Sequence, residues 1–113
     1  MKLTLDYPPS GNRYWRHNRG HIHRSAEADA YIRYVGLICA TAGLQPLDGD
    51  VRVQLNFYRP AKRGDLDNGI KVLVDSLQGY GYHNDSQIAE LHARRFEDRD
   101  APRVEVEIVE VEA

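Results

Sequence analysis

The sequence predicts a single α+β domain that contains a mixed β-sheet of about four strands, two helices and a C-terminal β-hairpin. Helical and strand-like hydrophobic patterns alternate along the first two thirds of the chain, and two strand-like segments follow near the C-terminus. A chain of 113 residues can bury a modest core without a disulfide or a structural metal. We therefore interpret residues 1–113 as one domain.

The chain opens with a short predicted strand. Residues 2–7 alternate apolar and polar side chains, as a half-buried strand does. Pro8 and Pro9 follow directly, and the strand is expected to end there because proline fixes φ and lacks a ladder donor. Residues 8–25 are expected to form a loop that leads into the first helix.

A helix and a second strand are predicted next. Ser25 is a suitable N-cap for a helix over residues 26–42, and Gly43 is a suitable residue to end it. Residues 51–58 alternate apolar and polar side chains without interruption. This pattern predicts a second half-buried strand.

The second predicted helix covers residues 67–77. Its apolar side chains recur at spacings of three and four, which places them on one face that should contact the core. They are Ile70, Leu73, Val74 and Leu77. Residues 86–96 and 103–111 have strand patterns, and the turn-forming cluster at 97–102 predicts that they pair as a hairpin.

Charge is distributed unevenly along the chain. The net charge of −2 by itself disfavours a nucleic-acid partner. Residues 1–63, however, carry ten Lys or Arg against five Asp or Glu, whereas residues 104–113 carry four Glu and no basic residue. Because a ligand meets only the local field, the N-terminal half can still attract a polyanion.

Cysteine content and hydropathy indicate a cytoplasmic protein. Cys39, the single cysteine, lies in an apolar helical pattern and has no partner for an internal disulfide. The first residues lack the uninterrupted apolar segment of a signal peptide. Since no apolar run reaches the roughly 18 residues of a membrane helix, we expect no membrane association.

Oxygen-bearing side chains concentrate where the second helix is predicted to begin. Asp65, Asp67 and Asn68 lie within four positions, and Asp85 adds a third carboxylate in a turn before a predicted strand. If that strand lies beside the second helix, the three aspartates converge, and such ligands suit Mg²⁺ or Mn²⁺. Helix capping by Asp67 is the alternative interpretation.

A divalent ion at these carboxylates would allow phosphodiester hydrolysis. Such an ion makes a bound water more acidic and stabilises the leaving oxygen. Lys71 follows Asp67 by one helical turn and could neutralise charge that develops on the phosphoryl oxygens. Alternatively, Asp67, Lys71 and Asp75 form a solvent-exposed polar stripe that contains an ion pair.

The N-terminal loop combines positive charge with flat aromatic surfaces. The segment contains Arg13, Arg16, Arg19 and Arg24 together with Tyr14 and Trp15. This combination is typical of segments that contact phosphates and stack on bases. The alternative is a polar loop whose aromatic residues anchor it to the core. Beside a metal site, contact with DNA is the better interpretation.

These segments together resemble a known family. Residues 64–79 and 84–88 resemble the metal-binding signature of the RusA family of Holliday junction resolvases, and residues 8–16 resemble its N-terminal segment. The signature combines Asp-x-Asp-Asn, a Lys four residues after the second Asp, Asp-Ser-Leu and a later Asp-Ser-Gln. Asn84 occupies a position where family members often have an acidic residue.

The resemblance implies a homodimeric crossover junction endodeoxyribonuclease that resolves Holliday junctions by paired phosphodiester hydrolysis, in DNA recombination and repair. Its expected cofactor is Mg²⁺, for which Mn²⁺ could substitute, and its expected partner is four-way junction DNA. Asp65, Asp67 and Asp85 would hold the metal, and Lys71 would act with them in catalysis. The residues expected to contact DNA are Asn12, Arg13, Tyr14, Trp15, Arg16, Arg19, Lys62 and Arg63.

Two other classes of function remain open from the sequence. One is a non-catalytic junction- or DNA-binding module whose aspartates serve as structural caps, and cleavage of junctions would exclude it. The other is a cytoplasmic metal-binding or interaction protein without a nucleic-acid partner. The basic and aromatic N-terminal segment argues against this second class, in which it would have no purpose.

Overall fold

The computed structural model describes the backbone of residues 1–9, 15–18, 21–61 and 66–111, and the side chains of these residues except 15–18, 21–23, 67 and 68. The elements follow in the order β1 (Lys2–Asp6), β2 (Trp15–Asn18), β3 (His21–Arg24), α1 (Ala26–Thr41), β4 (Val51–Arg59), α2 (Leu66–Leu77), the 3₁₀ turn η2 (Asp85–Gln87), β5 (Ile88–Glu97) and β6 (Arg103–Glu110). Across this described part of the chain, two α-helices accompany a four-stranded mixed sheet, which confirms the predicted α+β class.

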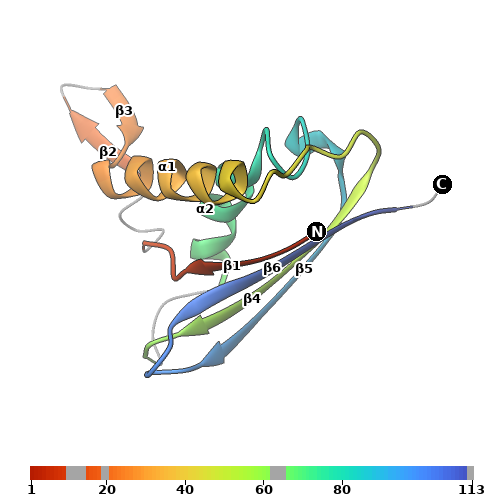
Figure 1. The fold of residues 1–113 in the computed structure, drawn as a ribbon. Helices are drawn as coiled ribbons and strands as arrows, with labels where there is room; N and C mark the ends of the chain where they lie inside the picture. The colour runs from red at the N-terminus through yellow and green to blue at the C-terminus, as the bar shows by residue number, and fades with distance from the viewer. Residues whose placement is uncertain (10–14, 19–20, 62–65, 112–113) are drawn as a thin grey trace.

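The main sheet has the strand order β1-β6-β4-β5. β6 is antiparallel to both β1 and β4, whereas β5 is parallel to β4. α2 forms the crossover between the two parallel strands, since parallel neighbours cannot be joined by a tight turn. α1 and α2 both lie on one face of the sheet, and neither covers the opposite face (Figure 1).

The predicted C-terminal β-hairpin is wrong. β5 and β6 run in opposite directions, as the turn-forming cluster between them indicated, but β4 lies between them in the sheet. Burial explains the order of the strands. Val104, Val106 and Ile108 of β6 are buried, so β6 gains from a central position, whereas most of β5 is exposed and occupies the edge.

Residues 8–25 are also not a loop throughout. β2 and β3 pair as an antiparallel two-stranded sheet, with Trp15 opposite Arg24 and Asn18 opposite His21. This small sheet projects beyond the start of α1 (Figure 1). Its strands contain too few apolar residues to give a strand pattern, although a two-residue connection that contains Gly20 is a hairpin signal in the sequence.

α1 begins where the sequence predicts. The side-chain oxygen of Ser25 accepts a hydrogen bond from the backbone N–H of Ala28 at 3.1 Å, as an N-cap does. Gly43 follows the helix with φ of 69°, a left-handed conformation that favours glycine. The side chains of α1 that are buried against the core include Tyr31, Val35 and Cys39.

α2 buries a wider face than its periodicity indicated. Leu73 and Leu77 are buried as predicted, but Val72 and Ser76 are buried too. The hydroxyl of Ser76 donates a hydrogen bond to the carbonyl of Val72 at 2.6 Å, so its burial leaves the donor satisfied. The wider face arises because α2 contacts both α1 and the sheet.

Neither of the described helices, of 16 and 12 residues, is long and apolar enough to cross a membrane. The cytoplasmic location inferred from cysteine content and hydropathy stays a prediction.

Candidate active site

The start of α2 is held against the C-terminal end of β4. A Cβ atom on Gly69 would lie 2.8 Å from the ring of Phe57, so glycine is needed for this close approach. Asp67 is the second residue of the helix and precedes Gly69 by two positions, and its side chain lies outside the described residues. Asp65 lies outside them altogether.

Lys71 lies one turn after Asp67 on α2 and its side chain is exposed. Its Nζ atom lies 3.3 Å from Oδ1 of Asp75, four residues further along the helix. This ion pair is the feature that the polar-stripe interpretation anticipated. The lysine amine therefore lies at the solvent-facing surface of α2.

Asp85 lies in a turn that is held by the side chains of its neighbours. Asn84, rather than Asp85, is the N-cap of η2, and its side-chain oxygen accepts a hydrogen bond from the backbone N–H of Ser86 at 2.9 Å. The backbone N–H of Asp85 itself donates to the side-chain oxygen of Gln78 at 3.1 Å. Because another residue caps the turn, the exposed carboxylate of Asp85 is not required for that purpose.

Gln87 connects this turn to the segment before β4. Its side-chain oxygen accepts hydrogen bonds from the backbone N–H groups of His83 and Asn84, at 2.7 and 2.9 Å. Its side-chain amide donates to the carbonyls of Leu47 and Gly49, both at 2.8 Å. One side chain thus satisfies four backbone groups from two separate segments. Sequence reasoning included Gln87 in the Asp-Ser-Gln element of the signature but assigned it no role.

We expect Gln87→Ala to destabilise the fold. The substitution removes all four hydrogen bonds, of which each contributes about 0.5–1.5 kcal/mol, so the free energy of unfolding should fall by about 2 kcal/mol. Urea denaturation would measure it. Gln78→Ala is the matched control, because it removes one hydrogen bond from the same turn and should cost less than about 1 kcal/mol. Equal losses would contradict the role of Gln87.

The Tyr82 hydroxyl lies between the turn and α2. It donates a hydrogen bond to the carbonyl of Val74 at 2.6 Å. Burial raises the pKa of Tyr82 above its ordinary value, and the carboxylates of Asp85 and Asp75 raise this pKa further. Both carboxylates therefore lie close enough to Tyr82 to act on it, which locates Asp85 beside the second half of α2.

Asp85 and Asp67 consequently lie at opposite ends of α2. Asp67 is in the first turn, whereas Asp85 contacts Gln78, which directly follows the last residue of the helix. With a rise of 1.5 Å per residue, the ten residues from Asp67 to Leu77 span about 15 Å. β5 follows Asp85 at the edge of the sheet and contacts α2. Because the side chains of Asp65 and Asp67 lie outside the described residues, the convergence expected from the sequence stays a prediction.

Among the described side chains, no group of three or more His, Cys, Asp or Glu residues is placed to hold a metal ion. Two of the three predicted ligands, Asp65 and Asp67, have no described side chain. The third, Asp85, fits in its chemistry: it is an exposed carboxylate on a well-anchored turn, which is the kind of donor that hard divalent cations prefer. The metal-ligand assignment stays a prediction.

The residues predicted to contact DNA lie in and around β2 and in the segment between β4 and α2. Trp15 and Arg16 belong to β2, and their side chains are outside the described residues. The positions that lie wholly outside them are Asn12, Arg13, Tyr14, Arg19, Lys62 and Arg63. Nearby Arg24 forms an ion pair with Asp29 at 3.1 Å.

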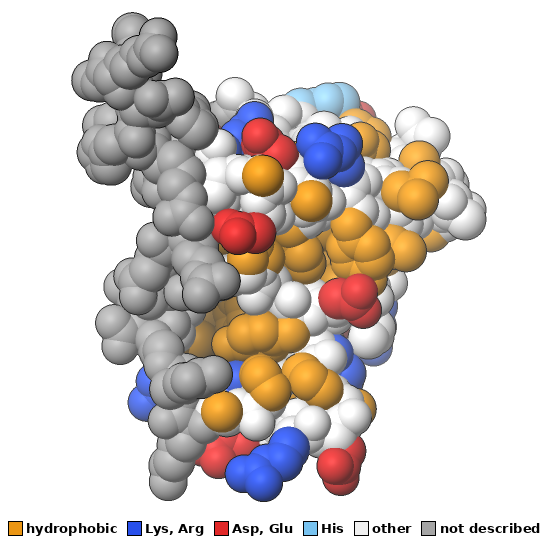
Figure 2. All heavy atoms as spheres, turned by 90° about the vertical axis from the view of Figure 1, so that its left-hand side faces the viewer, with side chains coloured by type: hydrophobic (Ala, Val, Ile, Leu, Met, Phe, Trp, Pro, Cys, Tyr) orange, Lys and Arg blue, Asp and Glu red, His pale blue; other side chains and the backbone are white. Residues whose placement is uncertain are grey.

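The view from the side of β2, β3 and the start of α1 does not show a uniformly basic surface. Hydrophobic side chains gather over the middle of this face, and both acidic and basic side chains are scattered around them (Figure 2). The described surface on this side therefore does not by itself indicate a polyanion site, and the predicted DNA contact depends on residues beyond it.

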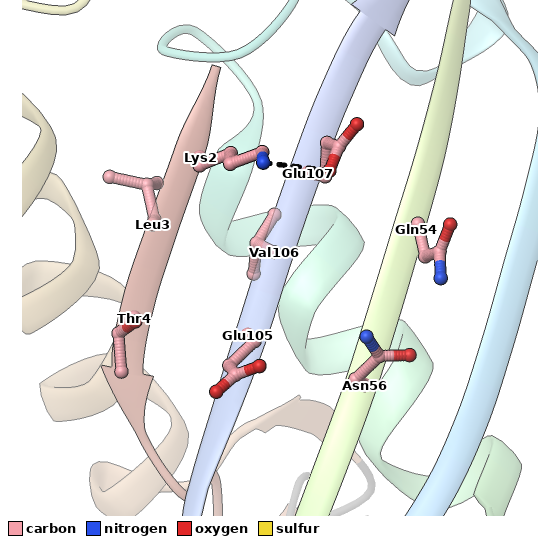
Figure 3. Close-up of a pocket in the computed structure, with 8 residues that line it drawn as sticks. All are labelled: Lys2, Leu3, Thr4, Gln54, Asn56, Glu105, Val106 and Glu107. Carbon is pink, nitrogen blue, oxygen red and sulfur yellow. Dashed lines mark ion pairs between the residues drawn. The ribbon is translucent and has the colours of Figure 1, made fainter.

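The open face of the sheet carries a shallow polar hollow of about 280 Å³. Its lining comes from β1, β6 and β4, and includes an ion pair between Lys2 and Glu107 at 3.8 Å (Figure 3). The side-chain oxygen of Asn56 is buried here without a hydrogen-bond partner among the described residues. Among the side chains that the structure describes, those of Lys71 and Asp85 do not line this hollow.

Comparison with known proteins agrees with the resemblance seen in the sequence. A family model described as "Endodeoxyribonuclease RusA" matches residues 6–109. A crossover junction endodeoxyribonuclease RusA from Escherichia coli (strain K12) is 37% identical over 112 residues, which cover 96% of this chain and 93% of that protein. A protein with the same description from Enterobacteria phage 82 is 36% identical with the same coverage. The region matched by the family model contains all of the predicted site residues.

Proposed function

The chain belongs to the endodeoxyribonuclease RusA family, and from this premise we propose that it is a Mg²⁺-dependent endonuclease that resolves Holliday junctions by paired phosphodiester hydrolysis. The observation that carries the proposal is the identity of 37% to a crossover junction endodeoxyribonuclease across 96% of this chain. Roles in DNA recombination and repair, in the cytoplasm, follow from this activity as part of the same proposal.

Asp65, Asp67 and Asp85 are the residues that would hold Mg²⁺, or Mn²⁺ in its place. When bound, such an ion supplies acidity to the attacking water and offsets charge on the leaving oxygen. Lys71 would direct positive charge to the phosphoryl oxygens in the transition state. The exposed amine and its loose pairing with Asp75 support this role, because a phosphate could take the place of that carboxylate.

A homodimer is part of the proposal for two reasons. A four-way junction offers two symmetrically related strands, and a two-fold dimer offers two identical sites to cut them. A second copy also provides a way to unite carboxylates that one protomer holds apart, because Asp85 of one copy could approach Asp67 of the other. The separation of about 15 Å along α2 supports this arrangement.

The direct test is incubation of the purified protein with labelled four-way junction and linear duplex DNA, with and without Mg²⁺. We expect symmetric nicks in the junction only when Mg²⁺ or Mn²⁺ is present, and much slower cutting of the duplex. Equal cutting of both substrates would indicate a general nuclease without selectivity for junctions. Junction binding without cleavage in any divalent ion would favour a non-catalytic binding module.

The basic N-terminal segment should contribute to junction binding. Replacing Arg13 and Arg16 together by Ala removes two potential phosphate contacts, so junction affinity should fall. The slope of log affinity against log salt concentration should also decrease in magnitude by about 2. Titration of junction DNA at several salt concentrations would measure both. Replacement of Arg33, which is exposed on α1, is the control and should leave the slope unchanged. An unaltered slope in the double variant would show that Arg13 and Arg16 do not contact DNA phosphates.

A further inference from the structure

Arg95 is an exposed arginine on β5 that faces the side of the sheet where the helices lie. In the parallel pairing of β4 and β5 it stands opposite Phe57, whose ring is buried against α2. Residues that stand opposite each other in a sheet share a face, so Arg95 also points to the helix side. α1 and α2 both lie over this face (Figure 1), yet the Arg95 side chain stays exposed to solvent.

Arg95 lies beside the start of α2. A Cβ atom on Gly69 would meet the Phe57 ring at 2.8 Å, so the first turns of the helix lie directly over Phe57. Neighbouring strands are about 4.8 Å apart, which places Arg95 one strand spacing to the side of this contact. Asp67 and Lys71 flank Gly69 by two residues on either side. A phosphate held by Arg95 would therefore lie near the residues to which the proposed function assigns metal binding and catalysis.

The charge of Arg95 is available to a ligand. Within the part of the chain that the structure describes, neither a hydrogen bond nor an ion pair engages its guanidinium. Glu97 lies two residues further on the same face of β5, but its Oε1 atom is 3.6 Å from the guanidinium of Arg59. Arg59 is 8% exposed, so this pair belongs to the packed end of the sheet. The buried arginine offsets the charge of Glu97, and the exposed one keeps its own.

Arg94, the preceding residue, has a different environment. It stands opposite Asn56 and so points to the open face of the sheet, away from the helices. Its guanidinium lies 5.0 Å from the centre of the Phe96 ring, and this cation–π contact accounts for its presence there. Arg95 has no corresponding contact with a described aromatic ring. The two consecutive arginines thus carry the same charge on opposite faces of one strand.

We propose that Arg95 binds a phosphate of the junction strand that is cut, close to the phosphate that is hydrolysed. This inference rests on the proposed function and adds a substrate contact to it. A guanidinium presents planar donors that match two oxygens of one phosphate. The contact is made to the DNA backbone, so it positions the strand beside α2 without reading its sequence.

Salt-dependent junction binding, measured without divalent metal, tests the contact. Arg95→Gln should weaken junction affinity about tenfold, because it removes a charge-assisted hydrogen bond. The slope of log affinity against log salt concentration should decrease in magnitude by about 1, because one phosphate contact is lost. Arg94→Gln is the matched control. It removes the same charge from the next residue on the opposite face, and it should keep the parental slope.

Arg95→Lys separates the charge from a general disturbance of β5. Lysine keeps the positive charge, so the slope should return to the parental value. Affinity should recover only in part, because an ammonium cannot bind two phosphate oxygens in a fixed planar geometry. Fluorescence anisotropy with a labelled four-way junction measures both quantities. Since both arginines are exposed, all three variants should keep the parental melting temperature within a few degrees.

Three results would each overturn the proposal. They are an unchanged slope in Arg95→Gln, equal decreases in Arg95→Gln and Arg94→Gln, and a Lys variant that behaves as the Gln variant does. The measurement needs no cleavage, so it is separate from the test of the proposed function. A shallower slope in Arg95→Gln, with a parental protein that binds junctions but never cuts them, would reject only the nuclease function. Symmetric cleavage with an unchanged slope would reject only the Arg95 contact.

Discussion

Asp85→Asn is expected to abolish most junction cleavage while the fold and DNA binding persist. The substitution keeps the shape of the side chain but replaces a charged metal ligand with a neutral amide, which binds Mg²⁺ poorly. Since a bound ion contributes several kcal/mol to transition-state stabilisation, nicking should fall by about a hundredfold or more. Single-turnover cleavage of a labelled junction across a Mg²⁺ titration would measure it.

The turn around Asp85 makes this variant interpretable. Asn84 caps η2 and Gln87 anchors it, so the loss of the Asp85 charge should leave thermal stability nearly unchanged. Junction affinity without metal should hold or rise, because one negative charge near the phosphates is removed. Asp48→Asn is the control: this exposed carboxylate contacts His83 in the same region at 2.9 Å and should be dispensable for cleavage. A folded Asp85→Asn variant that cuts at the parental rate would make Asp85 an ordinary turn residue.

Lys71→Gln should have the second largest effect. A neutral amide cannot supply positive charge to the phosphoryl oxygens, and removal of one such stabilising group from an active site typically costs about a hundredfold in rate. Because Lys71 is exposed and its ion pair with Asp75 contributes less than about 1 kcal/mol, we expect little change in thermal stability. The measurement is the rate constant for cleavage at saturating Mg²⁺.

Asp75→Asn separates catalysis from the loss of an ion pair. It breaks the same contact with Lys71 from the other side but leaves the lysine charge in place. Cleavage by this variant should stay within a few-fold of the parental rate, whereas Lys71→Gln should not. If both substitutions slow cleavage equally, the ion pair itself would be the important feature and Lys71 would not act on the phosphate.

Local features of the sequence determined several parts of this protein. Ser25 caps α1 because its hydroxyl satisfies a free backbone N–H group three residues later, and this requires no distant partner. The alternation in β4 likewise predicts its burial, since successive side chains point to opposite faces of a strand. The Asp, Asn and Lys spacing at the start of α2 indicated the family for a similar reason, because it is contained in a few consecutive residues.

Only the tertiary structure decided which elements are neighbours. β5 and β6 reverse direction as the intervening turn residues require, but strands compete for partners across the whole sheet, and the apolar β6 took the place beside β4. The same competition left β5 at the edge of the described sheet. The sequence predicted that Asp67 and Asp85 converge, but their backbones lie near opposite ends of α2. The length of the helix sets this separation, because each residue adds a fixed rise. Helix capping and the alternation of side chains along a strand are local properties of a chain, whereas pairing and distance depend on how all of its elements pack together.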